Sequence, residues 1–278
     1  MLTPDDLSCY VLPIIPGRRS ELTMNTSFPL PAEPRQAESR RFHALMARRI
    51  KTILMVSTHY EAFSLSWDGS PTTDIYGASS LLHLQNLPQI TTATTGREAL
   101  ELLRRERFDL VLISSNLADM PVGGLARAVK AAVPGLPVVV LMFTLGRVPA
   151  MPSGPYAGAD YLFSWQGSAK VLLSILKLIE DALNTDRDIR ICPIGVILMI
   201  EDSIKQYSFF LPALYTLLMK QAFARVPHGI DEAERQLHTR TRPKVVLART
   251  LAEAEALAER YRPFLHGVIS DLQVGAED

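Results

Sequence analysis

Residues 196–203 read Val-Ile-Leu-Met-Ile-Glu-Asp-Ser, an apolar run that ends in two acidic residues. Residues 267–270, Gly-Val-Ile-Ser, form a second run, which Asp271 follows. Short continuous apolar runs are typical of strands buried on both faces of a parallel sheet. In such sheets ligands bind beyond the carboxyl ends of the strands. We therefore expect Glu201, Asp202 and Asp271 to meet at one edge of a sheet.

Apolar runs and amphipathic helical patterns alternate along the chain from residue 51 onward. The first series predicts strands at 53–56, 89–93, 109–113, 136–142 and 161–163, with helices after Thr95, at 124–133 and at 168–184. The second series predicts strands at 196–200, 244–248 and 267–271, with helices at 204–222 and 250–261. Such alternation is typical of βαβ units with right-handed crossovers. The sequence thus predicts an α/β protein with two doubly wound parallel-sheet units, the second truncated after its third strand.

The same patterns set the expected domain boundaries. The N-terminal region contains six prolines before residue 41 and no sustained period, which is typical of a flexible tail. A short basic helix is expected within 41–50, and a further helix at 231–237. The expected divisions are a tail with its lead-in helix at 1–46, a first domain at 47–184, a linker at 185–194 and a second domain at 195–278.

Charge and cysteine content exclude several classes of protein. The chain carries 29 basic and 29 acidic side chains, so its zero net charge gives no general attraction to nucleic acid. Its cysteines are Cys9 and Cys192, which excludes a disulfide framework and a cysteine zinc site and fits a reducing cytoplasm. No apolar stretch reaches the roughly 18 residues that a membrane span needs. We therefore expect a cytoplasmic protein with neither nucleic-acid nor membrane partners.

The three carboxylates at the expected sheet edge indicate a metal site. Carboxylates held close together repel one another and need a cation, and hard oxygen ligands suit Mg²⁺. With the metal bound, an oxygen of Asp271 would attack an incoming phosphoryl group while the cation neutralises the developing charge. The alternative is that Glu201, Asp202 and Asp271 only end their strands and face water.

The two stretches quoted at the outset resemble the receiver domain of two-component response regulators, which has a flavodoxin-like fold. The resemblance implies that Glu201 and Asp202 hold Mg²⁺, and that Asp271 accepts a phosphoryl group from a histidine kinase or a phosphotransfer protein. The backbone carbonyl of Gln273 falls at the family's usual third protein ligand. The resemblance also implies a regulatory chain that is not itself an enzyme, with a C-terminal output domain outside it.

The second unit departs from the receiver pattern in its extent. The family also uses a Ser or Thr after its fourth strand and a Lys after its fifth, and both positions would fall beyond Asp278. We therefore expect an incomplete receiver. Its third strand would be an uncovered apolar edge, which is an aggregation liability.

The first unit resembles a receiver along its whole length but lacks the acidic residues. Ser57 and Thr58 stand at the acidic positions after the first strand. Ser114 stands at the phosphoacceptor position, with Ser115 beside it. Hydroxyl groups neither carry the charge that holds Mg²⁺ nor form an acyl phosphate. We expect a pseudo-receiver that serves as a packing or docking module.

Three further features of this unit carry alternatives. Asp119, in the loop after the third strand, is a candidate displaced phosphoacceptor. Near the lysine position of the family the chain reads Ser164-Trp165. Trp165 and the apolar helix at 168–183 form either a contact surface for a partner or part of the core.

A narrower resemblance concerns the tandem order of the two units. The strings at 164–167, 200–203 and 207–212 are similar to the N-terminal region of certain large bacterial proteins. In those proteins two receiver-like modules precede a phosphoenolpyruvate-synthase-like PEP/pyruvate-binding domain. This resemblance implies an alternative function, in which the chain is the N-terminal fragment of a PEP-synthase-like dikinase and both units serve only as an interaction or regulatory scaffold.

Overall fold

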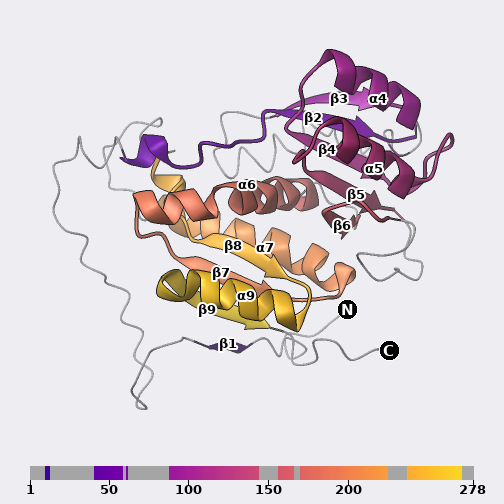
Figure 1. The fold of residues 1–278 in the computed structure, drawn as a ribbon. Coiled ribbons are helices and arrows are strands. Elements are labelled where there is room, and N and C mark those ends of the chain that lie inside the picture. Colours follow the sequence, from indigo (N-terminus) through magenta and orange to yellow (C-terminus); the bar gives the residue numbers. More distant parts are fainter. Residues whose placement is uncertain are drawn as a thin grey trace, which may run out of the picture. The chain divides into compact units, whose positions relative to one another are not determined.

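The computed structural model describes residues 10–12, 41–58, 61, 88–143, 156–165, 170–224 and 237–270. The chain divides into two compact units, each with its own β-sheet (Figure 1). The larger unit comprises residues 48–180 and 203–220. The smaller unit comprises residues 1–47, 181–202 and 221–278.

The larger unit contains a sheet of five parallel strands. They are β2 (Thr52–Val56), β3 (Gln89–Ala93), β4 (Leu110–Ser114), β5 (Val138–Met142) and β6 (Tyr161–Ser164). Their spatial order is β3-β2-β4-β5-β6, and all neighbouring pairs are parallel. This is the 2-1-3-4-5 order of flavodoxin-like doubly wound sheets. The predicted fold class is confirmed for this unit.

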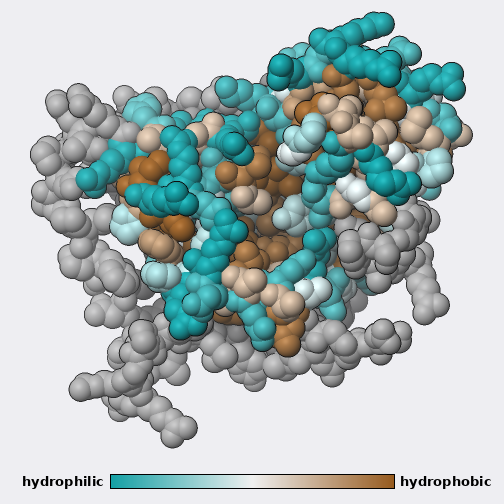
Figure 2. Space-filling model, viewed as in Figure 1, coloured by the Kyte–Doolittle hydropathy of each residue, from teal (hydrophilic) through white to brown (hydrophobic). Residues whose placement is uncertain are grey.

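Helices α4 (Gly96–Arg105) and α5 (Val122–Ala132) connect strands of the larger sheet. α4 begins where the Thr95 hydroxyl accepts a hydrogen bond from the Glu98 N–H at 3.2 Å. The Glu98 carboxylate in turn accepts from the Thr94 N–H at 2.7 Å. Side-chain capping of this kind fixes where a helix starts and stabilises it by about 1 kcal/mol. Figure 2 shows hydrophilic side chains gathered over the outer side of α4.

The smaller unit repeats the first three strands of this order. β7 (Val196–Ile200) lies between β8 (Lys244–Ala248) and β9 (Leu265–Ser270), and both pairs are parallel. α9 (Leu251–Tyr261) and the short 3₁₀ helix η2 (Arg262–Phe264) connect β8 with β9. The predicted second unit with three parallel strands is therefore confirmed.

Apolar side chains on one face of the smaller sheet pack against α9. The buried cluster consists of Val196, Leu198, Val246, Ala248, Ala254 and Tyr261. The strand residues alternate along β7 and β8, as expected for one face of a pleated sheet. Full burial of one large apolar side chain contributes about 1.5–3 kcal/mol, so this cluster gives the smaller sheet a core of its own.

Strand β1 (Tyr10–Leu12) adds an antiparallel strand to the smaller sheet. It pairs with residues 268–270 of β9, and the complete order is β1-β9-β7-β8. The prediction that the third strand of this unit is an uncovered edge is therefore wrong for residues 268–270. The remainder of the predicted tail, 1–9 and 13–40, lies outside the described residues.

Helix α6 (Lys170–Ile191) is longer than the predicted helix and occupies most of the predicted linker at 185–194. Within it the Thr185 hydroxyl donates to the Asp181 carbonyl oxygen at 2.7 Å, and Thr185 and Asp188 are both fully buried. Of the polar residues in this stretch, Thr185, Asp186 and Asp188 have partners inside the smaller unit. The division between the units falls within α6, after Glu180, instead of at the predicted linker.

Two other helices differ from expectation. α7 (Ile204–Ala224) follows β7, but residues 203–220 belong to the larger unit. The predicted lead-in helix at 41–50 is helical only at 41–44. The predicted helix at 231–237 lies outside the described residues except for Leu237. In the described part of the chain no helix is long and apolar enough to cross a membrane.

Candidate functional site

The acidic residues Glu201 and Asp202 directly follow β7, as predicted. At the end of this strand Ile200 lies in register with Ala248 of β8 and with Ser270 of β9. The Glu201 N–H donates to the Ala248 carbonyl oxygen at 2.9 Å, so the sheet ladder holds the Glu201 backbone. The carboxyl ends of the three parallel strands thus meet at one edge, next to the acidic pair.

The two described members of the predicted metal site differ in exposure. Glu201 is 6% exposed, whereas Asp202 is open to solvent. α7 begins directly after them, and the Ser203 hydroxyl accepts a hydrogen bond from the Gln206 N–H at 3.4 Å. Burial of an ionised carboxylate requires hydrogen-bond donors or a cation nearby.

Asp271 and Gln273, the predicted phosphoacceptor and carbonyl ligand, lie outside the described residues. The structure brings the end of β9 to β7 but does not position either of these two groups. Among the residues that it does describe, no three His, Cys, Asp or Glu side chains are grouped to hold a metal ion. The carboxylate oxygens of Glu201 and Asp202 are nevertheless ligands of the kind that Mg²⁺ prefers.

The corresponding edge of the larger sheet carries hydroxyl groups in place of carboxylates. Ser57 follows β2 and Ser114 ends β4, and each is 3% exposed. The Ser114 hydroxyl accepts a hydrogen bond from the Asn116 N–H at 3.3 Å. The buried hydroxyls of Ser57 and Ser115 have no hydrogen-bond partner within the described ranges.

Glu61 is a buried carboxylate at this edge that the sequence analysis missed. It is 5% exposed, and its Oε2 accepts from the Thr58 N–H at 3.2 Å and from the Thr58 hydroxyl at 2.8 Å. Its Oε1 accepts from the Asn116 side-chain amide at 3.1 Å. The spacing Thr58-x-x-Glu61 is that of a capping box, which is the signal that could have identified it. Three donors occupy this carboxylate, so its oxygens are already engaged within the protein.

Asp119, the alternative acceptor in the larger unit, caps a helix. Its carboxylate oxygens accept from the backbone N–H groups of Gly96 at 2.9 Å and Arg97 at 3.1 Å, at the start of α4. The hydrogen bond from Gly96 is the main reason that the pKa of Asp119 lies below its usual value. Both oxygens thus stabilise the positive end of a helix dipole, which is a structural role.

Ser164 and Trp165, the residues that the sequence analysis placed near the lysine position, form backbone contacts. The Ser164 N–H donates to the Ser208 hydroxyl at 2.9 Å, and the Trp165 N–H donates to the Met142 carbonyl oxygen at 2.7 Å. The Trp165 ring lies against Phe143, with 5.9 Å between ring centroids.

The apolar face of α6 in the larger unit belongs to the core. Residues 171–176 are all buried. Leu172, Ile175 and Leu176 line one small apolar pocket with side chains of β2, β3 and β4. Of the two alternatives for this helix, core and contact surface, the structure favours the core.

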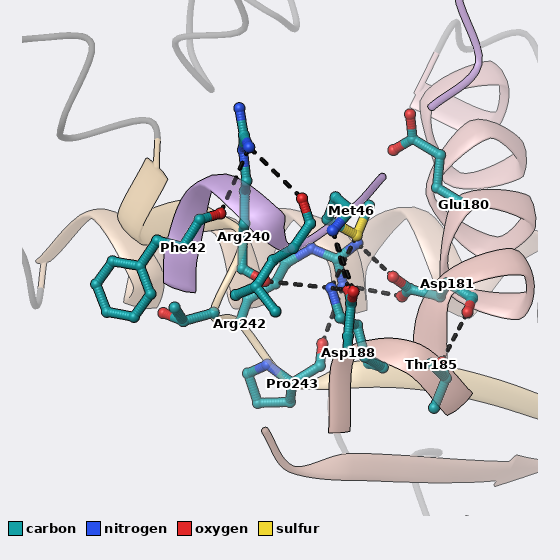
Figure 3. A network of polar contacts seen from close by, with 12 residues as sticks. Phe42, Met46, Glu180, Asp181, Thr185, Asp188, Arg240, Arg242 and Pro243 are labelled. Carbon is teal, nitrogen blue, oxygen red and sulfur yellow. Dashed lines mark hydrogen bonds and ion pairs between the residues drawn. The ribbon is translucent and has the colours of Figure 1, made fainter. Parts of the chain in front are cut away.

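A second polar cluster, drawn in Figure 3, lies at the other end of the smaller sheet. Lys244, the first residue of β8, pairs with Asp188 at 3.0 Å, and both side chains are fully buried. The same carboxylate accepts from the Met46 N–H at 3.1 Å. Burial lowers the pKa of Lys244. The cluster fixes residues 41–47 and the start of β8 to α6, and it lies at the strand ends opposite to Glu201.

No protein-family model and no curated protein matches this chain. Among solved structures, the N-terminal domain of a response regulator/sensory box/GGDEF 3-domain protein from Carboxydothermus hydrogenoformans is similar, with 18% identity and a TM-score of 0.35. The match covers 49% of this chain and 98% of that one. A receiver domain of a Francisella response regulator is similar with 15% identity and a TM-score of 0.34, over 48% of this chain and 99% of its own. The fold assignment rests on the strand order of the two sheets.

Proposed function

We propose that this chain is a regulatory region of the phosphorelay type, with a phosphoacceptor receiver in the smaller unit and a pseudo-receiver in the larger one. The observation that carries the proposal is the register between β7 and β9. Ile200 pairs with Ser270, so the acidic pair follows one strand at the point where Asp271 follows its neighbour. This arrangement supports a shared site for the three carboxylates.

Each site residue has a role in this proposal. Glu201, Asp202, Asp271 and the Gln273 backbone carbonyl would hold Mg²⁺, which would supply positive charge against the carboxylates and the phosphoryl oxygens. A carboxylate oxygen of Asp271 attacks the phosphorus of a phosphohistidine on a histidine kinase or phosphotransfer protein. The new O–P bond forms as the P–N bond breaks, and the leaving imidazole takes a proton from solvent.

The larger unit serves as a docking or packing module in this proposal. Its sheet edge presents Ser57 and Ser114, and the carboxylate of Glu61 is engaged by Thr58 and Asn116. Hydroxyl groups of this kind cannot form an acyl phosphate. The response to phosphorylation would therefore pass from the smaller unit to an output domain outside this chain.

A second candidate function is a scaffold in which neither unit is phosphorylated, as in the N-terminal part of a PEP-synthase-like dikinase. The hydroxyl edge of the larger unit favours it, because one copy of the fold already lacks the acidic residues. The coding sequence downstream of the codon for Asp278 tests the dikinase relationship. An ATP- and pyruvate-binding region there would support it, and an immediate stop codon would count against it.

Phosphorylation of the full-length gene product separates the two functions. The protein is incubated with Mg²⁺ and labelled acetyl phosphate, and the label is located by peptide mapping. We expect one acyl phosphate, released by hydroxylamine, on the wild type and on Ser114→Ala, and none on Asp271→Ala. An unlabelled wild type contradicts the receiver proposal. A label that remains on Asp271→Ala contradicts the assignment of the residue.

A further inference from the structure

The outer side of β9 is where the two sheets differ most in their construction. In the larger sheet β4 is followed by the parallel strand β5, with four residue pairs from Val111–Val138 to Ser114–Leu141. In the smaller sheet the equivalent strand β9 is followed by β1, which runs antiparallel and comes from the N-terminal end of the chain. A short strand from elsewhere in the sequence thus occupies the position of a fourth parallel strand (Figure 1).

Strand β1 covers only part of the outer side of β9. β9 has six residues, and β1 pairs with its last three, 268–270. Within the described part of the chain no strand pairs with residues 265–267 on that side. The sequence of β9, Leu-His-Gly-Val-Ile-Ser, has no Asp, Glu, Lys or Arg to repel an added strand. Of residues 265–267, His266 is exposed and Leu265 is half-buried, whereas Gly267 is buried. An uncharged strand along an edge that is only partly paired readily accepts another strand.

We propose that the outer side of β9 is a strand-docking surface, and that residues 10–12 are its resident occupant. The exchange partner is an extended apolar segment, without proline, that runs parallel to β9. Such a segment can pair along the whole of β9, whereas β1 makes three residue pairs. Because each added pair contributes further ladder hydrogen bonds, a longer strand can displace the shorter one. The proposal does not depend on phosphorylation of Asp271.

An engineered disulfide tests whether residues 10–12 pair with β9 in solution. Directly opposite residues of an antiparallel pair have Cα atoms about 4.5–5.5 Å apart, which lies within the roughly 4.4–6.8 Å that a disulfide spans. Val11 faces Ile269, so Val11→Cys with Ile269→Cys, in a Cys9→Ser, Cys192→Ser background, is expected to close an intramolecular bond on oxidation. Leu12→Cys with Ile269→Cys is the control, because a shift of one residue turns the two side chains to opposite faces. Equal cross-linking of the test pair and the control pair, or disulfides only between molecules, would show that residues 10–12 do not pair with β9 in this register.

Peptide binding tests the docking surface itself. The probe is a fluorescent peptide with the β5 sequence Val-Val-Val-Leu-Met, flanked by lysines for solubility, and anisotropy is measured. The control peptide carries proline at the central position, which removes a ladder N–H. Three full-length proteins are compared: the wild type, Val11→Pro, which weakens the resident strand, and the oxidised Val11→Cys/Ile269→Cys protein.

The expected order of affinity is Val11→Pro above wild type, with no binding to the cross-linked protein. If β1 occupies the edge in about nine tenths of the molecules, its loss tightens the apparent affinity about tenfold. Circular dichroism of Val11→Pro shows whether that protein is still folded, and the comparison of wild type with the cross-linked protein stands without it. Equal affinity for all three proteins, equal binding of the proline peptide, or no binding at all would overturn the proposal.

Discussion

Arg242 and Asp181 form a bidentate ion pair in the smaller unit, with nitrogen–oxygen distances of 2.9 and 2.8 Å (Figure 3). Their side chains are 3% and 0% exposed. The Asp181 carboxylate also accepts from the Val245 N–H at 3.0 Å. The pair therefore joins the C-terminal half of α6 to the start of β8, and its two charges compensate each other away from water.

Replacement of one member of this pair should strongly destabilise the smaller unit. Arg242→Ala leaves the Asp181 charge buried without its main partner, and such a change costs about 3–5 kcal/mol of unfolding free energy. Arg262→Ala is the control, because Arg262 and its partner Glu259 are 75% and 70% exposed. Exposed pairs contribute little, about 0–1 kcal/mol. Urea unfolding followed by circular dichroism measures both, and equal losses would contradict the buried role.

The capping carboxylate Glu61 should contribute more to stability than its exposed counterpart Glu98. Glu61→Ala removes three hydrogen bonds and leaves the Asn116 amide and the Thr58 N–H without this acceptor. Loss of partners for buried polar groups costs about 1–3 kcal/mol. Glu98→Ala removes the acceptor of the Thr94 N–H and hydroxyl at an exposed helix start, for which about 0.5–1 kcal/mol is expected. Thermal unfolding of both variants tests this order, and an equal or reversed order would contradict it.

Tyr261 should make the stability of the smaller unit depend on alkaline pH. Burial, together with its hydrogen bond to Asp186 at 2.9 Å, raises the pKa of Tyr261 from 10.0 to about 12. The folded state therefore keeps the phenol proton at pH values where the unfolded state loses it. The stabilisation is fully present below pH 10 and is lost as the pH rises towards 12.

The upper limit of this effect is about 3 kcal/mol, since the shift is about two pKa units and one unit corresponds to about 1.4 kcal/mol. Urea unfolding at several alkaline pH values is compared between the wild type and Tyr261→Phe. We expect the wild type to lose unfolding free energy more steeply than the variant over this range. Parallel curves for the two proteins would show that Tyr261 titrates normally in the folded state.

Most of the fold could be predicted because its signals are local. β5, Val-Val-Val-Leu-Met, is fully buried and stands out as a continuous apolar run. The alternation of such runs with helices is sufficient to predict a parallel sheet. The start of α9 is also determined by a local signal, since the Thr250 hydroxyl accepts from the Glu253 N–H at 3.1 Å.

The features that could not be predicted depend on partners far away in the sequence. Residues 185–191 look like a polar linker, but Asp181 and Asp188 of the same helix are paired with Arg242 and Lys244. β1 has only three residues, and its partner strand lies at the opposite end of the chain. No local pattern in either segment indicates these contacts.

The candidate site was predicted in part. Glu201 and Asp202 follow β7, and β9 ends beside that strand, because the strand order of a doubly wound sheet fixes which carboxyl ends are neighbours. Asp271 and Gln273 remain predictions, since they lie outside the described residues. Glu61 was not predicted because it lies three residues beyond Thr58 as a helix-capping residue, whereas the candidate residues were taken from the strand ends.

Glu201 should set the Mg²⁺ affinity of the smaller unit. Glu201→Gln keeps the shape of the side chain but removes a negative charge that the proposed site uses to hold the ion. We expect Mg²⁺ binding, followed by isothermal titration calorimetry, to weaken at least about tenfold, as changes near metal sites commonly do. Ser57→Ala is the matched control, because Ser57 occupies the corresponding position in the larger unit and should leave the affinity unchanged. Unaltered Mg²⁺ binding by Glu201→Gln would mean that Glu201 only ends its strand, the alternative that the sequence left open.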